Sequence, residues 1–325
     1  MLLCARLITL KPDYIRIIMN NQISRRKRAL NGVLLLDKDS GMSSNSALQR
    51  ARFLYGAAKA GHTGVLDPLA TGLLPVCFGE ATKFAQYLLD ADKAYIATLH
   101  LGVATSTGDA EGEIVATADT SITMAQVEAA IAAFSGEITQ TPPMYSAIKH
   151  QGKPLYEYAR AGITIERKSR QVTIYQIDIL EFAFPKLVIN VRCSKGTYIR
   201  TLAEDMAKHM GTLAYLTALR RTATAGFMIG ETHTLAAISN EDETARDNWL
   251  LPCDVLVQHF PAVTLTDKDI LQLQHGVAVH CEQNYGTISP LRIYAANGRF
   301  IGLVQYQAAS RRLKVLRLMN TASAS

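Results

Sequence analysis

The chain has 325 residues, of which 48% are hydrophobic and 19% charged, a composition that is typical of a folded globular protein and unlike a disordered one. Its length corresponds to about two domains, and no apolar run is long enough to cross a bilayer, which argues against a membrane-spanning protein. The net charge is +6, but residues 1–30 hold seven basic residues and one acidic residue, which accounts for all of it. Nucleic-acid binding by the rest of the chain therefore requires cations that are gathered locally.

Residues 1–30 form an N-terminal extension that we predict to be disordered. The stretch 1–18 has apolar patches broken by basic residues, and no cleavage site follows, so a secretory signal is not indicated. Its Arg-rich, acid-poor composition fits a mitochondrial transit peptide as the minor alternative. A start at Met19 would leave only a short basic tail, and we prefer this interpretation, which predicts a cytoplasmic protein.

The cysteines and histidines indicate no metal site. The five cysteines are scattered and form no CxxC pair, which favours a reducing compartment. His275, His280 and Cys281 lie close together in the sequence, but His280 and Cys281 are adjacent and would face opposite sides of a strand. The usual pairs of zinc ligands are absent from this pattern, so we predict no metal at this position.

Hydrophobic periodicity and turn residues divide residues 31–325 into predicted elements. The predicted helices span about 44–54, 80–89, 124–134, 155–161 and 197–210. The predicted strands span about 32–36, 94–101, 171–182 and 187–193. The predicted connections are an ordered loop over 61–72, a loop or flexible arm over 104–113 and an acidic linker over 239–247.

The mixed order of helices and β hairpins predicts an α+β fold with a mostly antiparallel sheet. We assign residues 31–250 to a catalytic domain and residues 251–325 to a small β-rich domain. No GxGxxG follows a strand and no GxxxxGK[ST] occurs, so the sequence has no motif for binding a dinucleotide or a nucleoside triphosphate.

Asp67 is the first candidate for a catalytic residue. It lies in a loop rich in Gly, Thr and Pro, where Pro68 restricts the backbone of both residues. Such a loop can hold a carboxylate rigidly at the edge of a cleft. The structural alternative is a solvated Asp-Pro turn, which is the more common use of this dipeptide.

A second candidate cluster begins where a strand ends at Cys193 and a helix begins near Thr197. Tyr198 and Arg200 fall in the expected first turn of that helix, where the partial positive charge favours anions. An arginine at this place could pair with a carboxylate or a phosphate. An ordinary surface Arg beside an interfacial Tyr is the alternative, and Tyr95 could likewise be only a strand residue that packs on the core.

Five segments taken together resemble the TruB family of pseudouridine synthases, and specifically its bacterial tRNA pseudouridine(55) synthases. They are the loop Gly61–Gly72, the strand Lys93–Tyr95, the turn Thr107–Asp109, the junction Ser194–Arg200 and the strand Leu219–Arg221. The resemblance runs from about residue 32 to the C-terminus, and the Gly-His-Thr-Gly and Leu-Asp-Pro-Leu-Ala-Thr-Gly sequences are its most specific part. Residues 1–30 lie outside it.

The resemblance implies that the protein isomerises uridine-55 in the T-loop of tRNA to pseudouridine by base flipping, without a cofactor or metal. It assigns Asp67 as the catalytic nucleophile, Arg200 as its cationic partner and Asp109 as an acid that completes the charge network. It assigns Tyr95 to stacking on the flipped uracil and to proton removal. The further pocket residues that it implies are His62, which occupies the space left by the nucleotide, Tyr198 and Leu219.

The expected RNA contacts are local. Phosphate contacts are predicted for Lys38, Lys195, Arg220 and Arg221, and by resemblance the C-terminal domain is PUA-like and contacts the acceptor end of tRNA, while the catalytic domain binds the T-arm. We expect a monomer with no obligatory protein partner. One alternative is a non-catalytic RNA-binding protein or tRNA-folding chaperone with the same fold. The other is the related guide-RNA-dependent enzyme of ribosomal RNA.

Overall fold

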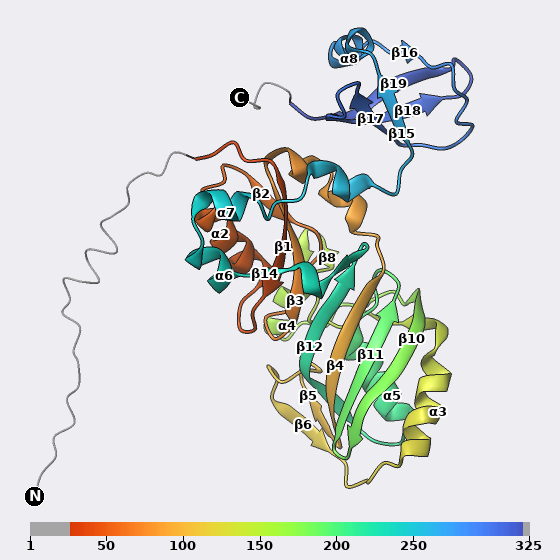
Figure 1. The fold of residues 1–325 in the computed structure, drawn as a ribbon. Helices are drawn as coiled ribbons and strands as arrows, with labels where there is room; N and C mark the ends of the chain where they lie inside the picture. Colours follow the sequence, from red (N-terminus) through yellow and green to blue (C-terminus); the bar gives the residue numbers. More distant parts are fainter. Residues whose placement is uncertain (1–26, 321–325) are drawn as a thin grey trace, which may run out of the picture.

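The computed structural model describes residues 27–320 (Figure 1). It has the predicted α+β fold, with a large mixed sheet in the body and a separate smaller sheet at the C-terminal end. A start at Met19 and most of the expected extension lie outside the described residues. Residues 27–30 belong to the body and do not fit the predicted disordered extension, because the backbone of Arg28 pairs with that of Ala57 and its guanidinium forms an ion pair with Asp247.

The large sheet contains ten strands. They are β1 Gly32–Lys38, β2 Ala60–His62, β3 Thr71–Phe78, β4 Lys93–Leu101, β7 Gly136–Gln140, β10 Arg170–Ala183, β11 Lys186–Cys193, β12 Ala214–Thr224, β13 Phe227–Met228 and β14 His233–Thr234. The order is β14-β1-β3-β12-β4-β11-β10-β7, with β2 beside β3 and β13 beside β12. Only the pairs β1–β14 and β3–β12 within this sheet are parallel, so the sheet is mostly antiparallel, as predicted.

Helices and two small hairpins surround this sheet. The α-helices are α2 Ser44–Leu54, α3 Met124–Phe134, α4 Leu155–Arg160, α5 Ile199–His209, α6 Leu235–Asn240 and α7 Glu243–Asp247. The 3-10 helices are η1 Gly79–Lys83, η2 Ala85–Leu88, η3 Ile229–Glu231 and η4 Cys253–Val257. The hairpins are β5 Val103–Thr105 with β6 Ile114–Thr117, and β8 Lys149–His150 with β9 Lys153–Pro154. The main core lies between the sheet and α2, α3 and α5.

Three predicted elements differ in the structure. The helix expected over 80–89 is the pair η1 and η2, and the Thr82 hydroxyl bonds the Gly79 carbonyl oxygen, a local bond that competes with regular helix formation. The segment 104–113, predicted as a loop or flexible arm, begins inside β5 and continues as the ordered turn between β5 and β6. Helix α5 begins at Ile199, because the backbone of Tyr198 is extended, so Tyr198 caps the helix instead of lying in its first turn.

The boundary between the two domains lies later than predicted. The expected linker 239–247 is helical and belongs to the body, where Asp242 caps α7. Leu251 pairs with Val33 of β1, and the buried Leu256 and Val257 of η4 pack on the second face of the sheet. The body therefore continues through Val257, because η4 supplies the apolar cover for that face.

The C-terminal domain is a five-stranded sheet with a core of its own. Its elements are β15 Ala262–Leu265, α8 Asp267–Gln274, β16 Val279–His280, β17 Leu291–Ala295, β18 Phe300–Gln307 and β19 Arg312–Leu318. Phe300 and Leu303 of β18 join the core formed by η1, η2 and η4, and the rings of Phe84 and Phe300 lie 5.3 Å apart. The domain is thus packed against the body through apolar side chains.

Candidate active site

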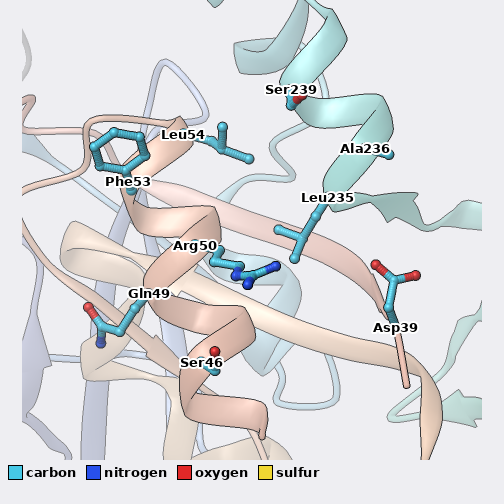
Figure 2. A pocket seen from close by; sticks show the side chains of 9 residues that line it. All are labelled: Asp39, Ser46, Gln49, Arg50, Phe53, Leu54, Leu235, Ala236 and Ser239. Atoms are coloured by element: carbon cyan, nitrogen blue, oxygen red, sulfur yellow. The ribbon is translucent and has the colours of Figure 1, made fainter. Parts of the chain in front are cut away.

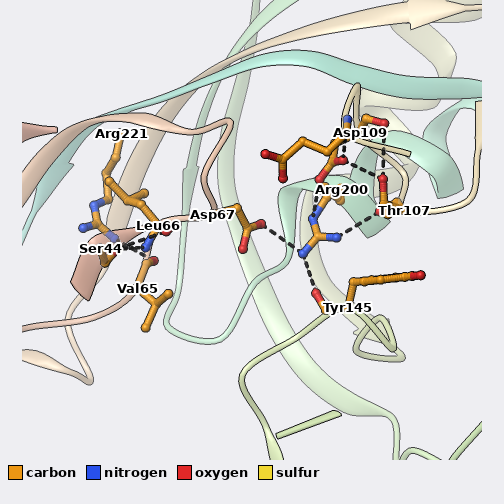
Figure 3. Close-up of polar contacts among 10 residues, drawn as sticks. Ser44, Val65, Leu66, Asp67, Thr107, Asp109, Tyr145, Arg200 and Arg221 are labelled. Atoms are coloured by element: carbon orange, nitrogen blue, oxygen red, sulfur yellow. Dashed lines mark hydrogen bonds and ion pairs between the residues drawn. The ribbon is translucent and has the colours of Figure 1, made fainter. Parts of the chain in front are cut away.

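Asp67 and Arg200 form an ion pair at the centre of the site. Asp67 Oδ2 lies 2.9 Å from Arg200 Nη2, and the Asp67 side chain is 41% exposed whereas that of Arg200 is only 6% exposed. Figure 3 shows the carboxylate of the loop between β2 and β3 pointing at the guanidinium of α5. The sequence segments that carry these two residues are therefore brought together by the fold, as the family resemblance implied.

The other contacts of Arg200 hold the guanidinium in place. Its Nε lies 3.6 Å from Asp109 Oδ2, its Nη1 donates to the Thr107 carbonyl oxygen at 2.9 Å, and its Nη2 donates to the Tyr145 carbonyl oxygen at 2.6 Å. Asp109 is itself buried and accepts bonds from the Thr107 hydroxyl and the Glu111 N–H. The predicted charge network of Asp67, Arg200 and Asp109 is thus present in the structure.

Two opposing influences set the ionisation of Asp67. Burial raises the pKa of the Asp67 carboxyl above its ordinary value, and the nearby charge of Asp109 raises it further. The charge and hydrogen bond of Arg200 oppose this shift, with a smaller contribution from Lys38. An ionised Asp67 is consequently only partly solvated and lies against the Arg200 guanidinium, which suits a carboxylate that must attack and later leave.

The backbone on both sides of Asp67 is fixed by contacts with β1 and α2. Ser44 Oγ donates to the Leu66 carbonyl oxygen at 3.0 Å and accepts from the Leu66 N–H at 2.8 Å. Lys38 Nζ donates to the Pro68 carbonyl oxygen at 3.3 Å, and the Gly41 N–H donates to the same oxygen at 2.9 Å. The loop is therefore a rigid support for the carboxylate.

Tyr95 and Leu219 lie on one face of the sheet, near this loop. Tyr95 of β4 is 7% exposed, and Leu219 of β12 is half-buried and pairs with Ala97, two residues further along β4. Burial is the main cause that raises the pKa of the Tyr95 phenol. The two side chains offer an aromatic and an aliphatic surface on the same side of adjacent strands.

His62 and Tyr198 are both half-buried. His62 ends β2, its Nδ1 is buried without a hydrogen-bond partner, and burial lowers the pKa of its imidazole. The Tyr198 backbone is held by the side chain of Gln140, which accepts from its N–H at 3.0 Å and donates to its carbonyl oxygen at 3.3 Å. The Arg170 guanidinium lies over the Tyr198 ring, 4.9 Å from its centroid.

The four cations predicted to contact phosphates fall into two groups. Lys195 and Arg220 are accessible, although each has an acidic neighbour, Asp90 at 2.9 Å and Asp37 at 2.7 Å. Lys38 is fully buried, burial lowers its pKa to about 8, and its ammonium donates to three carbonyl oxygens. Arg221 is 1% exposed. The structure does not place Lys38 or Arg221 where a phosphate could reach them, which contradicts the predicted contacts of these two residues.

Sequence reasoning missed Ser44, Gln140 and the carbonyl groups of Thr107 and Tyr145. Contacts through backbone carbonyls leave no trace in residue identity, and a buried Ser or Gln has no signal that separates it from a surface residue. Ser43 caps α2, and Ser44 follows it as the first residue of the helix. The Thr107 and Tyr145 carbonyl oxygens hold the Arg200 guanidinium, Ser44 holds the backbone beside Asp67, and Gln140 holds the backbone of Tyr198.

Two hollows in the surface lie at different distances from the Asp67, Arg200 and Asp109 network. One of about 520 Å³ has polar walls that include Thr107, Tyr145 and Glu204, and thus adjoins the partners of Arg200. A larger hollow of about 740 Å³ lies between α2 and α6, where Figure 2 shows Phe53 and Leu235 among its lining side chains. No predicted site residue lines the larger hollow, so it is separate from the catalytic cluster.

Residues 27–320 contain neither a cluster of metal-ligating side chains nor a helix that could span a membrane. No group of three or more His, Cys, Asp or Glu side chains in this range is arranged to hold a metal ion. His280 is exposed and Cys281 buried, so these neighbours face different ways, as their adjacency predicted. No helix among the described residues is long and apolar enough to cross a membrane.

Comparison with protein-family models gives three consecutive matches. Residues 52–199 match "TruB family pseudouridylate synthase (N terminal domain)". Residues 200–258 match "tRNA pseudouridylate synthase B C-terminal domain", and residues 261–319 match "Pseudouridine synthase II TruB, C-terminal". The junction between the last two matches falls just after η4, where the structure places the end of the body.

Relatives and solved structures agree with these matches. The tRNA pseudouridine synthase B of Neisseria meningitidis serogroup B is 65% identical over 300 residues, covering 92% of this chain and 98% of the relative. That of Chromobacterium violaceum is 54% identical over 299 residues, with the same coverage. Among solved structures, a chain of a Cbf5-Nop10-Gar1 complex superposes with a TM-score of 0.68 at 25% identity, covering 90% of this chain and 85% of that chain.

Proposed function

Since the chain belongs to the TruB family of pseudouridine synthases, we propose that it converts uridine-55 in the T-loop of tRNA to pseudouridine, with Asp67 as the nucleophile. The observation that supports this role best is the ion pair between the half-exposed Asp67 carboxylate and the buried Arg200. The relatives named above as tRNA pseudouridine synthase B support tRNA as the substrate.

The proposed reaction is an isomerisation. The bond between uracil N1 and ribose C1′ breaks, the base rotates, and a bond from uracil C5 to C1′ forms, while C5 loses a proton and N1 gains one. Asp67 forms a covalent adduct during this sequence and is released at its end. No electrons are gained or lost overall, so the chain's own acids, cations and rings are sufficient for the chemistry.

A uridine inside a folded loop must leave its stack before Asp67 can reach it. Extruding a nucleotide costs a few kcal/mol, which contacts between the base and a receiving pocket can offset. Tyr95 and Leu219 provide such surfaces, and Tyr198 adds a second ring that Arg170 and Gln140 hold in place. His62, half-buried at the end of β2, is proposed to fill the gap left in the RNA.

The remaining contacts with tRNA are also part of the proposal. Lys195 and Arg220 are accessible for phosphates of the T-arm. On β19 the side chains of Arg312, Lys314 and Arg317 are exposed and form a basic strip suited to the acceptor end. We propose a cytoplasmic monomer that acts without an obligatory protein partner. A purely RNA-binding role would not require the Asp67, Arg200 and Asp109 network.

Mapping of pseudouridine in tRNA tests the function directly. Unmodified tRNA is incubated with the purified protein, and pseudouridine is located by chemical labelling and mass spectrometry. We expect one modified position in the T-loop, with no added metal or cofactor. Absence of pseudouridine from tRNA that the protein demonstrably binds would refute the proposal and favour the chaperone alternative.

A further inference from the structure

Among the residues that the structure describes, Arg221 is a buried cation without a carboxylate partner. It lies in β12 with 1% of its surface exposed. Within residues 27–320, no carboxylate oxygen lies within 4 Å of its guanidinium, whereas Arg200 contacts the carboxylates of Asp67 and Asp109, and Arg220 contacts that of Asp37. Its Nη2 is also buried without a hydrogen-bond partner. Burial of an unpaired charge is strongly unfavourable, so its retention requires a reason.

The loop that carries Asp67 is folded around this side chain. Arg221 Nε donates to the Leu73 carbonyl oxygen at 2.7 Å, and Nη1 donates to the Val65 carbonyl oxygen at 3.5 Å. Figure 3 shows Arg221 beside the backbone of Val65 and Leu66. These bonds hold the chain both before and after Asp67.

Two glycines of the same loop allow this close approach. A Cβ added to Gly72 would lie 2.4 Å from the Arg221 carbonyl oxygen, and Gly72 has a φ of +99°, which L side chains rarely adopt. A Cβ added to Gly64 would lie 3.7 Å from Arg221 Nη1, at a φ of +88°. Gly64 and Gly72 thus serve two purposes. They adopt the positive φ angles of the loop, and they leave room for Arg221 close to its backbone.

Arg221 also lies directly opposite Tyr95. The two residues pair across β12 and β4, so their side chains share one face of the sheet, and both are buried. The charge of Arg221 lowers the pKa of the Tyr95 phenol, whereas Cys193 of β11 and Asp67 of the loop raise it. Arg221 therefore favours the phenolate form of Tyr95 against these two neighbours and against burial.

The other titratable groups whose pKa is shifted by the charge of Arg221 carry no stable negative charge. They are His62 at the end of β2, Lys93 of β4 and Lys38 of β1, and the charge of Arg221 lowers the pKa of each. None of them can neutralise the guanidinium. The register of the strands places the Tyr95 phenol opposite Arg221, and this phenol can become an anion by losing its proton, although burial raises its pKa overall.

We propose that Arg221 is a positioning residue for the isomerisation, which fixes the Asp67 loop from within and stabilises the Tyr95 phenolate across the adjacent strand. The inference rests on the proposed function. In that reaction the Tyr95 oxygen accepts the proton from uracil C5, the electron pair of the C–H bond returns to the ring, and Tyr95 later releases the proton to water. Arg221 itself touches no substrate. This positioning role takes the place of the phosphate contact that was predicted for Arg221 from the sequence.

Single-turnover rates at saturating tRNA test this role in Arg221→Met and Arg221→Lys. We expect the Met variant to lose about 10- to 100-fold in rate, because a small misplacement of a reacting group can cost about 100-fold, with little change in KM. The Lys variant keeps the charge and should recover part of the loss. The defect of the Met variant should shrink as pH rises, because a higher pH ionises Tyr95 without the help of Arg221. Arg192→Met, at an exposed position on β11, is the matched control and should behave as wild type.

A double-variant cycle separates a positioning role from general structural damage. If Arg221 acts through Tyr95, then Arg221→Met should add little to the loss already caused by Tyr95→Phe. Fully additive losses would overturn the role of Arg221 through Tyr95, and a higher KM at an unchanged saturated rate would overturn the inference as a whole. Should the Met variant not fold, the same cycle with Arg221→Lys decides. Failure of the wild type to modify tRNA would instead overturn the proposed function.

Discussion

Ser44 and Leu66, 22 residues apart in the chain, are joined by two hydrogen bonds: the Ser44 hydroxyl donates to the Leu66 carbonyl oxygen and accepts from the Leu66 N–H. Both residues are buried, and Asp67 follows directly. The position of Asp67 is thus set by a serine of α2 and not only by the loop's own sequence.

Replacing this serine should disturb catalysis and stability together. Ser44→Ala leaves the buried N–H and C=O of Leu66 without partners, which costs about 1–3 kcal/mol, and it loosens the support of Asp67. We expect a lower saturated rate with little change in KM, measured by single-turnover kinetics and thermal unfolding. Ser43→Ala removes the neighbouring helix cap, where Ser43 Oγ accepts from the Ser46 N–H, and should cost about 1 kcal/mol without affecting the rate. Equal rates for both variants would show that the Ser44–Leu66 bonds do not position Asp67.

Removal of the Arg200 charge should change the pH dependence of the rate. Arg200 lowers the pKa of Asp67 against the effect of burial, and only the ionised carboxylate can attack. In Arg200→Met the pKa of Asp67 rises further, so the acid limb of the pH–rate profile should move to higher pH, in addition to a strong loss of rate. Arg200→Lys should show a smaller shift. An acid limb that stays in place in the Met variant would show that Asp67 does not depend on this cation.

Asp67 itself should reduce stability at neutral pH. Its pKa is raised in the folded state, so the ionised form is less favourable there than in the unfolded chain, and this penalty is present above the folded pKa and absent below the unfolded one. Asp67→Asn should therefore leave the free energy of unfolding unchanged or higher near pH 7, and the difference should vanish in acid. Denaturant unfolding at several pH values measures it. A variant that is clearly less stable at neutral pH would contradict the stated direction.

The place of η4 in the body predicts the result of truncation. Leu256 and Val257 are fully buried against β1 and η2, and burial of each such side chain is worth about 1.5–3 kcal/mol. A chain that ends at residue 258 should therefore unfold at a higher temperature than one that ends at residue 250. Equal unfolding temperatures would instead support the domain boundary between residues 250 and 251 that was predicted from the sequence.

The sequence indicated the residues of the candidate site better than the residues that hold them in place. Asp67, Asp109 and Arg200 lie in specific motifs, and the structure brings them together. Lys38 and Arg221 were predicted as phosphate contacts because their residue type shows charge but not burial, and burial depends on strand pairing across distant segments. The late start of α5 follows from the extended backbone of Tyr198, which Gln140 holds from β7, and no local pattern reveals that contact.

The most direct test of the account is the single-turnover rate of pseudouridine formation by Asp67→Asn on T-arm RNA, measured beside its affinity for the same RNA. The substitution keeps the shape of the side chain and removes the nucleophilic carboxylate. We predict a loss of about 10⁴-fold or more in rate, with RNA affinity close to that of the wild type. Turnover within about tenfold of the wild type would remove Asp67 from the centre of the reaction.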